Sequence, residues 1–241
     1  MTVTARLEMP AFDAADIQGL ASFYTELTGW KIVRTDEDWI TVRTGDGQDL
    51  AFQLAPDHIA PQWPGQERPQ QFHLDIQVDD HQAAAERAVA LGAKRLAGGP
   101  SWITLADPAG HPFDLCQKDG VGPVMALFAV TIDAPKASPL AKFYADLMGM
   151  EVTYDGPEGA LISDGTKSVM FQQISDYQPP RWPDPEHPQQ GHLDIEVDDL
   201  DTGESRALEL GATKLADNAE SFRVFADPAG HPFCLTKAPQ A

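Results

Sequence analysis

The stretch Asp-Pro-Ala-Gly-His-Pro-Phe at residues 107–113 recurs letter for letter at residues 227–233, 120 positions later. Four further blocks repeat with the same offset to within one residue: Phe23-Tyr24 with Phe143-Tyr144, Trp63-Pro64 with Trp182-Pro183, His73-Leu74-Asp75-Ile76 with His192-Leu193-Asp194-Ile195, and Leu91-Gly92-Ala93 with Leu210-Gly211-Ala212. Five blocks in one register indicate a tandem duplication. Each position can therefore be compared with its twin, the position that the duplication relates to it.

Length and composition are those of a globular protein with two domains. The 241 residues allow two domains of about 120 residues each, which we place at 1–120 and 121–241. No apolar run reaches the roughly 20 residues that a membrane span needs, and the first residues lack a signal-peptide core. Cys116 and Cys234 are not twins, which argues against a structural disulfide. We therefore expect a cytoplasmic protein.

The charge balance limits the classes of partner. Lys and Arg number 17 against 37 Asp and Glu, which gives a net charge of −20. Nucleic acids and anionic membranes both need cationic residues to neutralise phosphates, so neither is an expected partner. The charge leaves two interpretations, which are a solvated acidic surface and attraction of a cationic ligand.

Each half contains two units of one strand, one helix and three further strands. The four units, which we call modules, cover about 1–55, 71–118, 124–175 and 190–238. In the first module Asp13 or Asp16 is available as N-cap, and Gly29 stands where the helix should end. The Pro-rich segment 55–70 should form no regular element. Strands are predicted at 7–12, 30–34, 39–44, 49–54, 72–78, 94–96, 102–106 and 113–117.

Alternation along the strands separates two faces of each sheet. In segment 72–78, Leu74, Ile76 and Val78 should lie under the helix, which turns His73 and Asp75 to the opposite face. An antiparallel sheet with helices on one face and polar groups on the other suggests a curved cup. By the same alternation, the other inward residues are Gln53, Asp114, Gln172, His192, Asp194 and Cys234.

These residues resemble the vicinal-oxygen-chelate superfamily, which includes glyoxalase I, bleomycin-resistance proteins and extradiol dioxygenases. The resemblance rests on the two helices that end Phe-Tyr-x-x-Leu-x-Gly, the two His-Leu-Asp-Ile strands and the Asp-Pro-x-Gly turns. It implies an α+β fold in which four βαβββ modules form two glyoxalase-like domains with cup-shaped, curved antiparallel sheets. Members of the superfamily pair their modules within a half or across halves, and both arrangements remain open here.

The resemblance also implies four inward positions at which metal-using members place ligands. Here they hold Met9 and Ala129, Gln53 and Gln172, His73 and His192, and Asp114 and Cys234. Met and Ala supply no hard ligand and Gln is a weak one, so we expect no metal cofactor. If a divalent ion were bound, its ligands would be His73, Asp114 and Gln53.

The paired histidines and aspartates are the candidate catalytic residues. His73 and His192 could be general bases oriented by Asp75 and Asp194, each about 7 Å further along its strand. They could equally be structural histidines that are hydrogen-bonded in a wet cavity.

Other repeated or reactive residues have competing interpretations. His111 and His231 belong to the repeated turn, which favours a structural role. Trp63 and Trp182 lie in Pro-rich loops, where they could stack on a planar ligand or cover a sheet edge. Cys234 on a buried strand is more typical of a small apolar residue than of a nucleophile.

No nucleophile elbow, phosphate loop, dinucleotide fingerprint or Cys-x-x-Cys motif is present in the sequence. We therefore expect a protein, monomeric or homodimeric, that binds a small aromatic or cationic molecule without metal. Its candidate ligand-binding residues are Gln53, Gln172, Trp63, Trp182, Met9, Asp114 and Cys234. The first alternative is a metal-independent lyase or isomerase, in which His73 or His192 moves a proton beside a carbonyl and Gln53 or Gln172 stabilises the oxyanion. The second is a metal-dependent glyoxalase or dioxygenase.

Overall fold

Four βαβββ modules follow one another along the chain, as the sequence predicts. The structure is a computed structural model that describes residues 5–216 and 220–238. The first half contains β1 (Ala5–Ala14), α1 (Ile17–Thr28), β2 (Lys31–Thr35), β3 (Trp39–Arg43), β4 (Asp49–Leu54), β5 (Phe72–Val78), α2 (His81–Ala90), β6 (Lys94–Gly98), β7 (Trp102–Ala106) and β8 (Pro112–Gln117). The second half contains β9 (Ala126–Ala134), α3 (Ala137–Met148), β10 (Glu151–Asp155), β11 (Gly159–Ser163), β12 (Ser168–Gln173), β13 (Gly191–Val197), α4 (Leu200–Leu210), β14 (Thr213–Ala216), β15 (Phe222–Ala226) and β16 (Pro232–Lys237).

Local signals set the ends of α1. The Asp16 carboxylate accepts a hydrogen bond from the Gly19 amide at 2.9 Å, so Asp16 is the N-cap. Gly29 ends the helix in the left-handed conformation, with φ of 79°. The second candidate cap, Asp13, is wrong, because β1 continues to Ala14 and holds Asp13 in a buried strand position.

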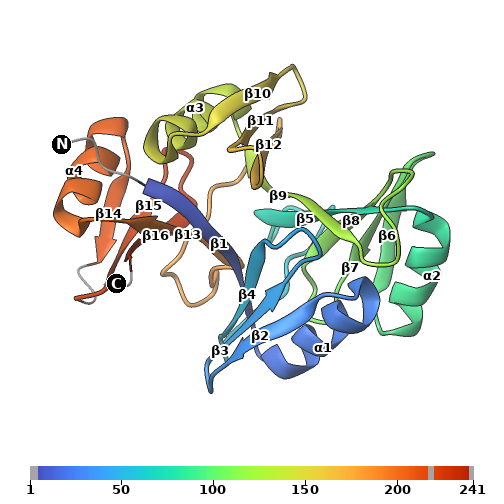
Figure 1. Ribbon diagram of the computed structural model, residues 1–241. Helices are drawn as coiled ribbons and strands as arrows, with labels where there is room; N and C mark the ends of the chain where they lie inside the picture. Colours follow the sequence, from blue (N-terminus) through green and yellow to red (C-terminus); the bar gives the residue numbers. More distant parts are fainter. Residues whose placement is uncertain (1–4, 217–219, 239–241) are drawn as a thin grey trace.

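Each of the two eight-stranded sheets combines modules from both halves of the chain (Figure 1). The first has the order β14-β15-β16-β13-β1-β4-β3-β2, and the second has the order β10-β11-β12-β9-β5-β8-β7-β6. The antiparallel pairs β1–β13 and β5–β9 join the modules at the centre of each sheet. Modules therefore pair across halves within the sheets, and the alternative of pairing within a half is wrong.

The sheets are mixed, whereas the sequence suggested antiparallel sheets. Strands β1 and β4 run parallel, and so do β5 and β8, β9 and β12, and β13 and β16. The helix between the first and second strands of each module and the two hairpin strands that follow bring the last strand back beside the first in the same direction. Parallel pairing within the module does not change which side chains face the hollow, because alternation is a property of each strand.

The two modules of one half contact each other through their helical layers. Tyr24 of α1 packs against Phe113 of β8 at 5.9 Å between ring centroids, and its hydroxyl donates to Asp107 at 3.0 Å. In the second half, Tyr144 of α3 repeats both contacts with Phe233 and Asp227. Sheets thus join the halves, while the buried tyrosines join the two modules inside each half.

The repeated turn histidines lie in this core and not in the hollows of the sheets. His111 and His231 are 1 % and 0 % exposed, and each places Nδ1 near the carboxylate of Asp107 or Asp227. These contacts favour the structural role that their repetition suggests. In the described ranges 5–216 and 220–238, no helix is long and apolar enough to cross a membrane.

Candidate functional site

The first sheet forms a cavity of about 460 Å³, which we call the His192 cup. Strands β1, β4, β13 and β16 supply its floor, so the first and fourth modules build it together. The described residues that line it are Glu8, Met9, Arg34, Asp38, Trp39, Gln53, His192, Asp194, Glu196, Ser221, Phe222, Cys234, Thr236 and Lys237.

The second sheet forms a cavity of about 440 Å³, which we call the His73 cup. It belongs to the second and third modules, because its residues lie on β5, β7, β8 and β12, on the loop before β5 and on the turn before β7. The described residues that line it are Trp63, Gln70, His73, Ser101, Trp102, Thr104, Asp114, Cys116, Gln117 and Gln172.

Most of the sequence-derived candidates line one of the two cups. Met9, Gln53, His192, Asp194 and Cys234 line the His192 cup, whereas Trp63, His73, Asp114 and Gln172 line the His73 cup. Asp75 lies beside His73. Trp182 is half-buried and is not among the described residues that line either cup.

The trio suggested as possible metal ligands does not come together. Gln53 lies on β4 in the first sheet, whereas His73 and Asp114 lie on β5 and β8 in the second. The suggestion depended on pairing within a half, which the strand order excludes.

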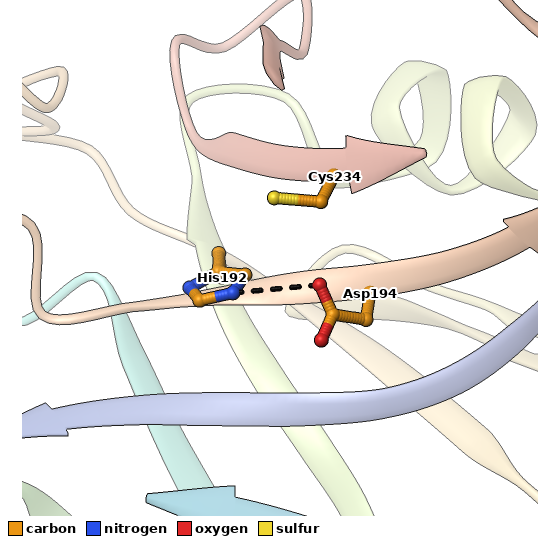
Figure 2. Close-up of side chains that lie close together, drawn as sticks. All are labelled: His192, Asp194 and Cys234. Atoms are coloured by element: carbon orange, nitrogen blue, oxygen red, sulfur yellow. Dashed lines mark ion pairs between the residues drawn. The ribbon is translucent and has the colours of Figure 1, made fainter. Parts of the chain in front are cut away.

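In each cup the histidine lies close to the aspartate two residues further along the strand. His192 Nε2 is 3.4 Å from Asp194 Oδ1, and His73 Nε2 is 3.8 Å from Asp75 Oδ1. Figure 2 marks the first of these contacts by a dashed line, with Cys234 on the neighbouring strand. Both separations are well below the 7 Å rise between their backbone positions, because the two side chains lean toward each other along the strand. Burial alone would lower the pKa of His192, but a hydrogen bond to Asp194 and the charges of Asp194 and Asp13 outweigh it and raise that pKa.

The third polar position differs between the cups. In the His73 cup it is Asp114, which accepts a hydrogen bond from Thr104 and whose pKa is raised by burial. In the His192 cup it is Cys234, and burial raises the pKa of that thiol far above its ordinary value. A thiol that keeps its proton is a poor nucleophile and a poor metal ligand, which agrees with the inert interpretation.

An amide behind each histidine was missed in the sequence. Gln70 Nε2 lies 3.3 Å from His73 Nδ1, and Gln189 Nε2 lies 3.2 Å from His192 Nδ1. The same amides contact two buried acids, Asp133 and Asp13. A signal was available, because Pro-Gln-Gln precedes both repeated strands, at 69–71 and 188–190.

Aromatic walls were missed as well. Trp102 of β7 and Phe222 of β15 are twins 120 residues apart, and each lines its own cup. Trp39 is also in the His192 cup, with its ring centroid 6.4 Å from that of His192. Comparison of twin positions would have found the first pair.

Each cup gathers three potential metal ligands, which are His73, Asp75 and Asp114 in one and His192, Asp194 and Cys234 in the other. Within each trio the ligand atoms lie within 4.8 Å of one another. Imidazole and carboxylate are ligand types that suit a divalent cation. A ligating nitrogen needs a free lone pair, so the fit of a metal depends on which ring nitrogen carries the proton. In both cups Nδ1 is opposite an amide nitrogen, and Nε2 faces the aspartate of the trio.

Comparison with known families agrees with this geometry. The family model described as Glyoxalase-like domain matches the chain twice, over residues 9–116 and 129–236. The chain belongs to the glyoxalase-like family. With the two copies it is a tandem member of the vicinal-oxygen-chelate superfamily, as its motifs suggest. A search of curated protein sequences gave no match.

Solved structures show the same fold over nearly the whole glyoxalase-like chain. Glyoxalase I from Zea mays is 18% identical, with a TM-score of 0.69 over 98% of this chain and 93% of its own. A putative dioxygenase from Bacillus subtilis is 12% identical, with a TM-score of 0.64 over 100% of this chain and 87% of its own. At these identities the likeness shows the arrangement of the modules and leaves the chemistry to the residues of the cups.

Proposed function

We propose that this glyoxalase-like protein binds a small organic molecule without metal, and that the His73 cup takes a ligand that is cationic, aromatic or both. The observation that carries the proposal is the lining of this cup. It combines two tryptophans with a carboxylate, and none of the described residues that line it is Lys or Arg.

The aromatic wall supports a flat or cationic ligand. Trp102 is 38% exposed although it stands over a cavity, and Trp63 lines the same cavity from the Pro-rich loop. A tryptophan face attracts a cation by about 0.5–2 kcal/mol, depending on how far the pair is removed from water. An exposed indole at the wall of a 440 Å³ cavity is therefore available for stacking.

The charge of the cup supports the same ligand. Asp114 lies in the lining, and Asp75 lies next to His73 with its carboxylate held by the Thr131 hydroxyl. The lining of the His192 cup has four acids, Glu8, Asp38, Asp194 and Glu196, but it also holds Arg34 and Lys237, which a cationic ligand would meet directly. We therefore expect an organic cation to prefer the His73 cup, because its aromatic wall stands beside a carboxylate with no Lys or Arg among the described lining residues.

A probe that carries both features tests the proposal. We expect benzyltrimethylammonium to bind and to quench tryptophan fluorescence, and benzyl alcohol, which has the ring without the charge, to bind more weakly. Asp114→Asn should weaken binding of the cation by about tenfold, which corresponds to roughly 1.4 kcal/mol. Trp102→Ala should weaken it by about 3- to 30-fold. Isothermal titration calorimetry measures all four affinities.

The matched control is Phe222→Ala, which removes the twin of Trp102 from the other cup. It should leave the affinity for benzyltrimethylammonium unchanged. The proposal fails if benzyl alcohol binds as tightly as the cation, or if Phe222→Ala weakens binding as much as Trp102→Ala does.

The His192 cup favours a second function, acid–base chemistry of the lyase or isomerase type. His192 is buried against Asp194, its pKa is raised, and Gln53 lies in the same cavity as a donor for a developing oxyanion. In this arrangement the Nε2–H of His192 would donate to the carbonyl oxygen as general acid, and the Asp194 carboxylate in the same cavity would take the proton from the adjacent carbon.

Solvent deuterium exchange tests this second function. A panel of α-hydroxy ketones and dicarbonyl compounds in deuterium oxide should show exchange beside the carbonyl, followed by NMR. His192→Asn should reduce the exchange rate by about 10²- to 10⁴-fold, the range for a general acid or base. The twin substitution His73→Asn serves as control. Equal loss in both variants, or exchange that survives His192→Asn, contradicts a role for His192.

A further inference from the structure

The amide of Gln70 stands between the cup histidine and a buried acid. Its Nε2 is 3.3 Å from His73 Nδ1 and also 3.3 Å from Asp133 Oδ1. All three residues are at most 5% exposed. The three groups lie on the loop before β5, on β5 and on β9, so the bridge crosses from the second module to the third.

The other cup holds the equivalent groups. Gln189 Nε2 is 3.2 Å from His192 Nδ1, and the Gln189 side chain is close enough to Asp13 to lower the pKa of that acid against the larger effect of burial, which raises it. Asp13 on β1 is the twin of Asp133 on β9, and it is 3% exposed. The third polar position has diverged between the cups, with Asp114 in one and Cys234 in the other. Both cups nevertheless keep a glutamine amide and a buried acid behind the imidazole.

The contacts fix which end of the amide faces the histidine. An ionised carboxylate only accepts hydrogen bonds, so the amide atom beside Asp133 must be the NH₂ group. That group has two hydrogens, and the second is directed at Nδ1, which must then carry a lone pair. A neutral imidazole has one N–H, so the proton is on Nε2.

We propose that Gln70 with Asp133, and Gln189 with Asp13, are positioning pairs that hold the neutral cup histidines in the Nε2–H form. The imidazole then presents a proton to the cup and keeps its lone pair for the amide behind it. The proton points to Asp75 or Asp194, and in the His73 cup it anchors a carboxylate beside the cavity that would hold the cationic ligand. In this form Nε2 carries a proton and has no free lone pair, so it cannot act as a ligand to a divalent cation bound by the trio.

The ligand part of this inference rests on the proposed function, but the proton position does not, and it can be measured without any ligand. Nitrogen-15 NMR of the histidine rings, recorded at alkaline pH where the imidazoles are neutral, distinguishes the two forms directly. We expect Nε2–H for His73 and His192 in the unmodified protein. Zn²⁺ added to that sample should leave the His73 ring signals in place.

The variant Gln70→Glu supplies an acceptor in place of the donor. It should transfer the His73 proton to Nδ1, leave His192 as it was, and allow Zn²⁺ to shift the His73 signals. Gln77→Glu, a substitution on the same strand at an exposed contact with Lys118, should change neither ring. Backbone amide spectra establish that the variants are folded.

Two results overturn the inference. One is an Nδ1–H form of His73 in the unmodified protein, and the other is Zn²⁺ coordination by His73 in that protein. Loss of the organic ligand with the Nε2–H form intact would instead refute the proposed function alone, so the two failures are distinguishable.

Discussion

Replacement of Asp107 by alanine should lower the free energy of unfolding by about 3–5 kcal/mol. The Asp107 carboxylate is buried and accepts hydrogen bonds from the Tyr24 hydroxyl and from the backbone amides of Ala109 and His111. The alanine would leave these donors without a partner inside the protein. Since Tyr24 belongs to the first module and Asp107 to the second, the loss falls on the contact that joins the two modules of one half.

Urea denaturation followed by circular dichroism measures this loss. Tyr24→Phe is the matched control, because it removes one donor and leaves the carboxylate with its backbone partners, and it should cost only about 1 kcal/mol. Asp227→Ala, the twin substitution, should cost as much as Asp107→Ala, since Asp227 accepts from Tyr144, Ala229 and His231 in the same way. A loss below about 1 kcal/mol for both alanine variants would contradict a structural role of the repeated turn.

The modules themselves could be predicted from the sequence because their signals are local. Alternation gave β5 and β7 with their observed bounds, and the caps and glycines gave the helix ends. The same alternation put Leu74, Ile76 and Val78 in the core, where the structure has them. The duplication then extended each of these predictions to the second half.

The pairing of modules could not be predicted, because no local pattern records which strand edges meet. The short connection 118–125 allows β8 and β9 to lie in one sheet, on either side of β5. The Pro-rich connection 55–71 carries the chain from β4 in the first sheet to β5 in the second. The lengths of these connections favour pairing across halves. The alternation of apolar and polar residues along the strands fits pairing within a half and pairing across halves equally well.

The sequence predicts the cup residues whose orientation depends on one strand alone. It does not predict contacts between residues of two different modules. His73, Asp75 and Asp114 follow from alternation on β5 and β8. Gln70 and Asp133 come from different halves of the chain, so their contact depends on the β5–β9 pairing. The sequence alone offers Asp13, the twin of Asp133, as a helix cap, because an acid just before a helix usually has that role.

Asp133→Asn should stabilise the protein above pH 6 and leave it unchanged in strong acid. Asp133 is 5% exposed, and burial, the largest influence, raises its pKa from 3.8 to about 6. Between these values the folded state holds a proton that the unfolded state has lost, so stability falls as the pH rises through this window. At pH values above this window the folded protein carries the full free-energy cost of the buried charge, which is about 3 kcal/mol for a pKa shift of roughly two units. The asparagine has no charge to bury, and its amide oxygen can still accept the hydrogen bond from Gln70.

We therefore expect Asp133→Asn to gain about 3 kcal/mol in urea denaturation near pH 8 and almost nothing below pH 4. The exposed control Asp119→Asn should change stability by less than about 0.5 kcal/mol at either pH. A gain of equal size at both pH values would exclude ionisation as the cause, and a loss near pH 8 would mean that the carboxylate stabilises the fold. A gain confined to high pH means that the chain carries a charge at a cost to its own stability. Such a cost is typical of functional positions, and the contact of Gln70 with both Asp133 and His73 is the geometry on which the proposed control of the cup imidazole rests.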